Sequence, residues 1–185
     1  MYVDLLKNEL KKTYPSFSLI RRILRNAGRF RVRSIVPVLF KHFDKVVPLL
    51  REIVLYLLKV LTKDIAKSYK DEFQKIIDSP RTQLPFVNTW IAALLQHPAF
   101  NAIELPKNYD KILTLRDCAL IATRREDRTW VKGYKNGVDT LGPWDKRAVL
   151  YSAQILSKDE KRTWLRIAGR RGGCLEAAVA KFAAS

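Results

Sequence analysis

Apolar residues recur at helical spacing along most of the chain, and this periodicity limits the possible fold more than any other feature. One helix face is made by residues at positions i, i+3, i+4 and i+7, namely Ile20, Ile23, Leu24 and Ala27. In Val46–Leu61 apolar residues cover most of the helix circumference, which is typical of a helix in the middle of a bundle. No segment has the alternation that is typical of a strand. The sequence therefore predicts an all-α protein.

Residues that favour helix ends separate these periodic segments. Side chains able to cap a helix N-terminus are Ser16 or Ser18, Ser34, Thr62, Thr114, and Ser157 with Glu160 as a capping box. Gly28 is expected to end the second helix in the left-handed conformation. Helices of about 10–18 residues with short connections predict either a HEAT-like helical-hairpin solenoid or an irregular helix bundle.

The length of 185 residues predicts a single α-helical domain over residues 1–185. The alternative is a division into two halves, residues 1–95 and 106–185. They would be joined by a looser connection that contains Pro98 and Pro106.

Positive charge is in large excess and is unevenly distributed. The formal net charge is +17, with +9 in residues 1–61, +1 in 62–112 and +7 in 113–185. A field of this sign attracts polyanions. RNA or DNA is therefore the first expected partner, ahead of an anionic membrane surface, and a solvated, salt-bridged helical exterior is the alternative that needs no partner.

The cysteines and the apolar segments indicate a cytoplasmic protein that does not cross a membrane. Cys118 and Cys174 lie far apart without further ligands, so we expect free thiols in a reducing compartment. The most apolar segment has an uncharged run of only Ile53–Leu58, far short of the roughly 20 residues that span a bilayer.

No set of residues suited to catalysis stands out, and we expect no metal and no cofactor. His42 and His97 have no metal-ligating partner at helical spacing. Adjacent carboxylates on a helix point about 100° apart, so we expect a structural use for the two such pairs, Glu126-Asp127 and Asp159-Glu160. An enzyme in which Glu126, Asp127 or His97 acts is the remaining alternative.

Arginines form two sets that we predict to bind nucleic acid. The first set lies on the second helix and the turn after it: Arg21, Arg22, Arg25, Arg29, Arg31 and Arg33. The second set lies near the C-terminus: Arg162, Arg166, Arg170 and Arg171. Guanidinium groups with no acid nearby repel one another, and their planar fork suits phosphate.

The glycines near the C-terminus do not form a P-loop, because the run after Gly169 lacks the Gly-Lys-Ser/Thr ending. The alternative that stays open is a flexible turn, Arg170-Arg171-Gly172-Gly173, that contacts phosphate.

The tryptophans lie on apolar stripes, so we expect them to pack inside rather than to stack on bases. This holds in particular for Trp144 and Trp164 of the helix hairpin expected over Pro143–Leu165.

Leu115–Leu165 carries a resemblance to a known family. The residues that carry it are Arg124-Arg125, Trp130, Pro143-Trp144-x-x-Arg147-Ala148-x-x-Tyr151-Ser152-Ala153 and Leu156-x-x-Asp159-Glu160-x-x-x-Trp164-Leu165, with Tyr14-Pro15-Ser16 earlier in the chain. This pattern resembles the helical region that follows the polymerase domain of prokaryotic reverse transcriptases of the abortive-infection-like and antiphage-defence group.

The resemblance implies a non-catalytic nucleic-acid-binding module of an RNA-directed DNA polymerase, with a polymerase domain as a further partner and a role in phage defence. The chain has no Tyr-x-Asp-Asp and no adjacent aspartates, so none of the catalytic residues of that family carries over. The alternative is a helical-repeat scaffold that docks an acidic protein partner.

Overall fold

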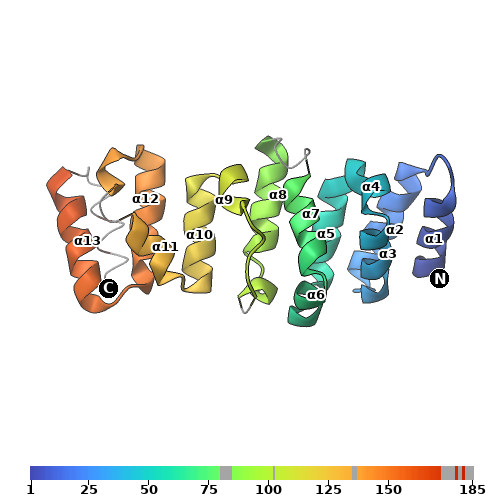
Figure 1. The fold of residues 1–185 in the computed structure, drawn as a ribbon, viewed down its shortest axis with the longest axis horizontal. Helices are drawn as coiled ribbons and strands as arrows, with labels where there is room; N and C mark the ends of the chain where they lie inside the picture. Colours follow the sequence, from blue (N-terminus) through green and yellow to red (C-terminus); the bar gives the residue numbers. More distant parts are fainter. Residues whose placement is uncertain (80–84, 102, 135–136, 172–177, 179–180, 182–185) are drawn as a thin grey trace. The chain divides into compact units, whose positions relative to one another are not determined.

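The protein is all-α, as the periodicity predicts. The computed structural model describes residues 1–79, 85–101, 103–134, 137–171, 178 and 181, and excludes the side chains of residues 85–86, 139 and 165–171. Within these residues the regular elements are helices and there is no strand (Figure 1). The chain divides into two compact units, Met1–Ile112 and Leu113–Ser185. This boundary falls after the Pro-containing connection rather than within it.

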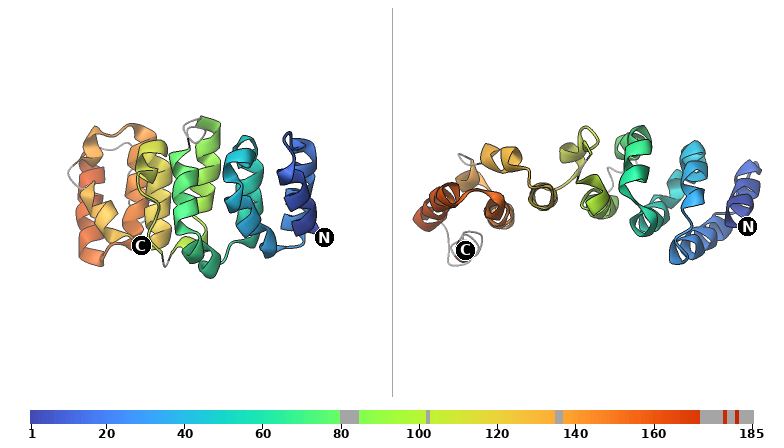
Figure 2. Two further views of the ribbon diagram at one scale, coloured as in Figure 1. Left: turned by 45° about the vertical axis from the view of Figure 1, so that its right-hand side comes forward. Right: turned by 90° about the horizontal axis from the view of Figure 1, so that it is seen from below.

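Unit 1 contains short helices and 3-10 turns. In chain order they are α1 (Tyr2–Lys11), α2 (Phe17–Arg29), η1 (Arg33–Ile35), α3 (Val36–Lys41), α4 (Phe43–Val46), η2 (Val47–Leu49), α5 (Leu50–Val60), α6 (Lys63–Ser68), α7 (Lys70–Asp78), α8 (Pro85–Leu95), η4 (Pro98–Phe100) and α9 (Tyr109–Ile112). Helix α2 packs on α5, and α5 packs on α8. The right-hand view of Figure 2 shows these three helices on one side of unit 1 and α3 and α7 on the other.

Aromatic rings join the helices of the second layer. The ring of Phe40 in α3 contacts Tyr69 at 5.1 Å and Phe73 of α7 at 5.3 Å between centroids. Phe73 in turn meets Phe100 edge-on at 5.1 Å. Such pairs contribute roughly 0.5–1.5 kcal/mol each beyond their buried area. Unit 1 is thus built from two helical layers, as expected for helical hairpins.

The prediction that Val46–Leu61 is one helix and the most buried one is wrong, because the segment is divided and Ile35–Phe43 has a larger share of buried residues. Pro48 interrupts Val46–Leu61, because a proline inside a helix removes a backbone donor and clashes with the preceding turn. Val47–Leu49 is a 3-10 turn, and α5 begins only at Leu50. Ile53 and Leu57 are fully buried, which follows from the position of α5 between α2 and α8.

The prediction that Gly28 ends α2 in the left-handed conformation is wrong. Gly28 lies inside α2, and its φ is not positive. The left-handed residue is Arg31, with φ of 52°. The N–H of Arg31 donates to the carbonyl of Gly28 at 3.2 Å, and the N–H of Val32 donates to the carbonyl of Ala27 at 2.8 Å. These two bonds form a Schellman motif that normally takes glycine where Arg31 stands.

Gly28 serves helix packing instead. A Cβ added there would lie 3.1 Å from the side chain of Lys59 and 3.6 Å from that of Tyr56. The missing side chain therefore lets α2 approach α5 closely.

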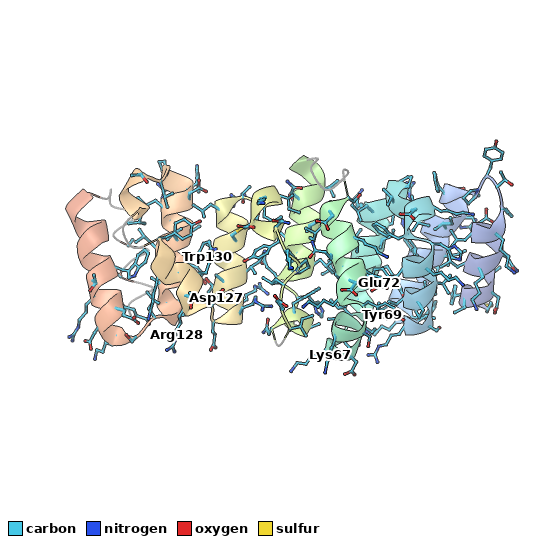
Figure 3. All side chains as sticks on the ribbon, viewed as in Figure 1. Lys67, Tyr69, Glu72, Asp127, Arg128 and Trp130 are labelled. Carbon is cyan, nitrogen blue, oxygen red and sulfur yellow. The ribbon has the colours of Figure 1, made fainter. Side chains whose placement is uncertain are left out.

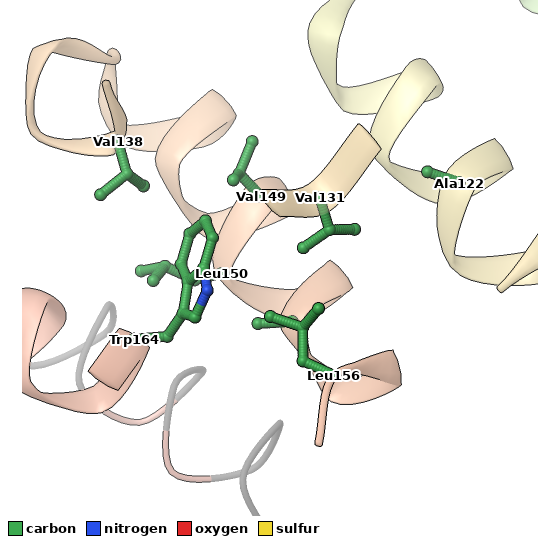
Figure 4. Packing of buried hydrophobic residues seen from close by; sticks show 8 residues of the cluster. Ala122, Val131, Val138, Val149, Leu150, Leu156 and Trp164 are labelled. Atoms are coloured by element: carbon green, nitrogen blue, oxygen red, sulfur yellow. The ribbon is translucent and has the colours of Figure 1, made fainter. Parts of the chain in front are cut away.

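Unit 2 packs around one apolar cluster. Its elements are α10 (Leu115–Arg125), α11 (Arg128–Gly133), η5 (Val138–Thr140), α12 (Pro143–Ser152), η6 (Ala153–Ile155) and α13 (Lys158–Arg171). Side chains from these elements meet in the cluster shown in Figure 4, where Val149, Leu150 and Trp164 lie together. Helices α10 and α12 make the most extensive contact in the unit.

Several predicted caps are confirmed and one is wrong. The hydroxyls of Ser16, Thr62 and Thr114 each accept a hydrogen bond from the backbone N–H three residues later, at 3.4, 3.3 and 3.2 Å. Glu160 accepts from both the N–H and the hydroxyl of Ser157, at 3.0 and 2.7 Å. Ser34 caps nothing, because the 3-10 turn Arg33–Ile35 precedes α3.

Candidate nucleic-acid interface

The arginines of α2 lie on its exposed face. Ile20, Ile23 and Leu24 are buried against the rest of unit 1, which places Arg21, Arg22, Arg25 and Arg29 outward on the same helix. Arg31 and Arg33 are exposed in the segment that follows. All six predicted side chains of the first set are therefore accessible to a ligand.

Arg21 differs from the rest of the set because it has an acidic partner. Its Nε donates to Oε1 of Glu52 in α5 at 2.9 Å. We expected no acid near these arginines, and for Arg21 this premise is wrong. The reason is that Glu52 is distant in sequence and is brought next to Arg21 only by the packing of α5 on α2. Arg21 is thus partly neutralised.

Arg25, Arg29 and Arg31 border an open hollow between α2 and α5. The hollow has a volume of about 740 Å³ and is also lined by Lys59. We name it the cationic hollow. Asn26, Gly28 and Leu58 complete its lining, and no carboxylate is among the lining residues. Within the described residues, Arg25, Arg31 and Lys59 make no ion pair.

Short-range contacts hold the cationic hollow in shape. The Tyr56 hydroxyl in α5 donates to the carbonyl of Val32 at 2.6 Å and ties the segment after α2 to α5. Burial raises the pKa of Tyr56, so it keeps the proton that this bond requires. The guanidinium of Arg29 lies 5.8 Å from the ring centroid of Phe30. Together with the Schellman motif at Arg31, these contacts position Arg29 and Arg31, two of the four cations.

The structure brings together only part of the predicted set. Arg22 and Arg33 are exposed but do not line the cationic hollow, and Arg21 is paired with Glu52. Lys59 was not predicted, because it lies on another helix and the sequence does not show that α5 faces α2. The signal that could have found it is Gly28, because a glycine inside a helix can mark a place where another helix packs closely.

The second predicted set is described only in part. Arg162 is exposed and lies 3.5 Å from Asp159, one turn earlier in α13. The side chains of Arg166, Arg170 and Arg171 lie outside the described residues, as do Gly172, Gly173 and Cys174. Cys118 is buried.

The prediction that Trp144 and Trp164 both pack inward is right for one and wrong for the other. Trp164 is 3% exposed and belongs to the cluster of unit 2, whereas Trp144 is 69% exposed. Trp144 follows Pro143 in the first turn of α12 and points away from the cluster, and the guanidinium of Arg147 covers its ring at 4.9 Å. Trp130 is partly buried and packs against Tyr134 at 4.7 Å.

The acidic and histidine side chains considered for catalysis have structural contacts. Nδ1 of His97 accepts from the N–H of Ala99 at 3.1 Å, and partial burial lowers its pKa. Asp127 caps α11 by accepting from the N–H of Trp130 at 3.0 Å (Figure 3). Glu160 lies 2.6 Å from the ammonium of Lys132. Asp127 and Glu160 thus each have a structural contact, as expected for these two members of the acidic pairs.

Two negative findings apply to the described part of the chain. In it, no three or more His, Cys, Asp or Glu side chains are grouped so that they could hold a metal ion. Nor does any helix there have the length and apolar character needed to cross a membrane.

Comparisons with known proteins give no relative. No family model, curated protein or solved structure matches the chain.

Proposed function

We propose that this chain is a non-catalytic nucleic-acid-binding module that holds the phosphate backbone in the cationic hollow. The observation that carries the proposal is the convergence of Arg25, Arg29, Arg31 and Lys59 on one hollow with no carboxylate in its lining. Like charges gathered in this way destabilise the folded state. A bound polyanion relieves that repulsion, and guanidinium groups bind phosphate oxygens in pairs.

The shape and place of the hollow support a backbone contact rather than a small-molecule site. It is open and lies on the surface between two helices, so a strand can run through it without threading. Its polar lining is cationic, with only Asn26 as a neutral polar residue. Contacts of this kind bind without regard to base sequence.

We further propose that the module works with an RNA-directed DNA polymerase, in phage defence. The resemblance of Leu115–Leu165 to the helical region of antiphage reverse transcriptases supports this part. A polymerase domain on the same or a separate chain would supply the chemistry, and this chain would hold template, primer or product.

The test is equilibrium binding to labelled single-stranded RNA and DNA and to duplex DNA over a range of salt concentrations, followed by fluorescence anisotropy. Each phosphate contact on a single strand contributes roughly −0.7 to the slope of log affinity against log salt. Arg25→Glu with Arg29→Glu should therefore weaken binding to every sequence and flatten the slope by roughly 1.4.

Lys63→Glu with Lys67→Glu is the matched control. These residues are also exposed and one turn apart, on α6 (Lys67 is labelled in Figure 3), and they do not line the hollow. Both double variants change the net charge equally. Equal weakening by the two would mean that only net charge matters, and the hollow would not be the binding site.

A scaffold that docks an acidic protein is the second candidate, and the same cations favour it. The two functions separate at low salt. If the wild-type protein binds no RNA or DNA there, nucleic-acid binding is refuted and the acidic partner takes its place.

A further inference from the structure

The geometry points to an unpaired nucleobase as the occupant of a second hollow, directly beside the cationic hollow. This inference rests on the proposed nucleic-acid binding and specifies its form, namely a single strand with one base inserted. The second hollow has a volume of about 240 Å³ and shares Arg25 and Lys59 with the first. We name it the base hollow.

The lining of the base hollow suits a flat, partly apolar group. Three of its lining residues form an apolar floor: Leu24 and Tyr56, which are buried, and Leu55, which is half-buried. About 240 Å³ is below the roughly 300–1,000 Å³ of pockets that take drug-sized ligands, so a single heterocycle fits better than a larger molecule. Nucleobases bind single-strand sites by placing their faces against apolar and cationic side chains.

Glu52 argues against a second phosphate in the base hollow. Its carboxylate lies in the lining, is 12% exposed, and accepts from Arg21 through Oε1 at 2.9 Å. A carboxylate repels phosphate but accepts hydrogen bonds from the N–H groups on base edges, as acidic residues do with cytosine in duplex grooves. The cationic hollow has no such group.

Arg51 also lines the base hollow. The ring of Trp90 in α8 lies 5.1 Å from its guanidinium, an arrangement that favours one position of the Arg51 fork. A planar guanidinium held in this way can stack on a base or contact the next phosphate. The two hollows thus present, next to one another, the cations, the apolar residues and the carboxylate that could contact one nucleotide and its flanking phosphates.

The experiment compares three labelled ligands on the wild-type protein: a short single-stranded DNA, the same strand with abasic sugars and all its phosphates, and the duplex. We expect the abasic strand to bind more weakly by roughly 5- to 150-fold, the range that the loss of one stacked base produces. The salt dependence should be equal for the two single strands, because their phosphates are the same. The bases of the duplex are paired and unable to enter the hollow, so its binding should depend on phosphate contacts alone, with the steeper salt slope of duplex DNA, roughly −0.9 per contact.

Two variants on the same helix locate the effect. Leu55→Gln makes the floor of the base hollow polar and should reduce the difference between the normal and abasic strands. Leu58→Gln is the control, because Leu58 is also half-buried on α5 but lines only the cationic hollow. It should leave the difference unchanged.

The outcomes separate the inference from the proposed function. Equal, salt-dependent binding of normal and abasic strands overturns the base hollow and leaves phosphate binding intact. A difference that both variants reduce equally, or that neither reduces, also overturns the assignment to this hollow. Failure of all three ligands to bind refutes the proposed function and the inference together.

Discussion

Arg31 carries a backbone cost that a single substitution can measure. It occupies the left-handed position of the Schellman motif after α2, with φ of 52°. An L-residue in this conformation costs roughly 1–2 kcal/mol, because its Cβ crowds the following carbonyl. Glycine has no such cost. Arg31 also lines the cationic hollow, so a residue that is unfavourable for the backbone supplies a charge to the candidate site.

Arg31→Gly should stabilise the protein. The relief of about 1–2 kcal/mol is offset by the roughly 0.5–1 kcal/mol that glycine loses through its greater freedom in the unfolded chain. The net gain is therefore about 0.5–1 kcal/mol. For a chain of this size, each kcal/mol corresponds to roughly 2–4 °C in Tm.

Arg31→Ala is the control that isolates the backbone term. Both substitutions remove the same charge and relieve the same repulsion from Arg29 and Lys59, but only glycine removes the strain. Urea denaturation followed by circular dichroism should place Arg31→Gly about 0.5–1 kcal/mol above Arg31→Ala. Nucleic-acid affinity should fall equally in both variants. If the glycine variant were no more stable than the alanine variant, the left-handed conformation at this position would carry no measurable cost, and the prediction would be refuted.

Three further predictions concern the core, a surface ion pair and a tryptophan. Leu57→Asp places an unpaired carboxylate in a fully buried position and should unfold unit 1, since it costs several kcal/mol; a soluble variant with unchanged circular dichroism would contradict this. The Lys132 ammonium, with further bonds from Ser157, lowers the pKa of Glu160 to about 2. Because the folded pKa lies below the unfolded value, Glu160 stabilises the protein above about pH 4.5. That contribution disappears as the pH falls through about 2, so urea denaturation should find Glu160→Gln less stable than wild type at pH 7 and equal to it near pH 2. Iodide should quench Trp144 but not Trp164, so Trp144→Phe should remove most of the quenchable fluorescence; unchanged quenching in that variant would place Trp144 inside.

Local signals in the sequence predict the helices well. The caps at Ser16, Thr62 and Thr114 are short-range hydrogen bonds, and a cap depends on residues within one turn of itself. The burial of Ile53 and Leu57 follows equally from the apolar circumference of their segment. The all-α class could be predicted because these signals agree along the chain.

Predictions from the sequence fail where the surroundings of a residue are set by side chains that are distant in the sequence or by tertiary packing. Gly28 is typical of a helix end, yet its role is to admit the side chains of Tyr56 and Lys59 from α5. Trp144 lies on an apolar stripe with Ala148, but it sits in the first turn of α12, where its ring contacts Arg147 and stays largely exposed. Neither outcome can be read from the periodicity of one helix.

The same limit applies to the candidate interface, and it explains why arginines one turn apart have different roles. Spacing predicts that Arg21, Arg25 and Arg29 share a face of α2, but the charge that each one meets depends on α5. Glu52 and Lys59 lie two helical turns apart on α5, and they face opposite ends of the arginine stripe. Glu52 neutralises the end at Arg21, whereas Lys59 adds to the charge near Arg29. The two ends of the arginine stripe therefore differ in charge. The positive charge is greatest near Arg29 and Lys59, where phosphate is proposed to bind, and a carboxylate lies near Arg21, where a base is proposed to enter.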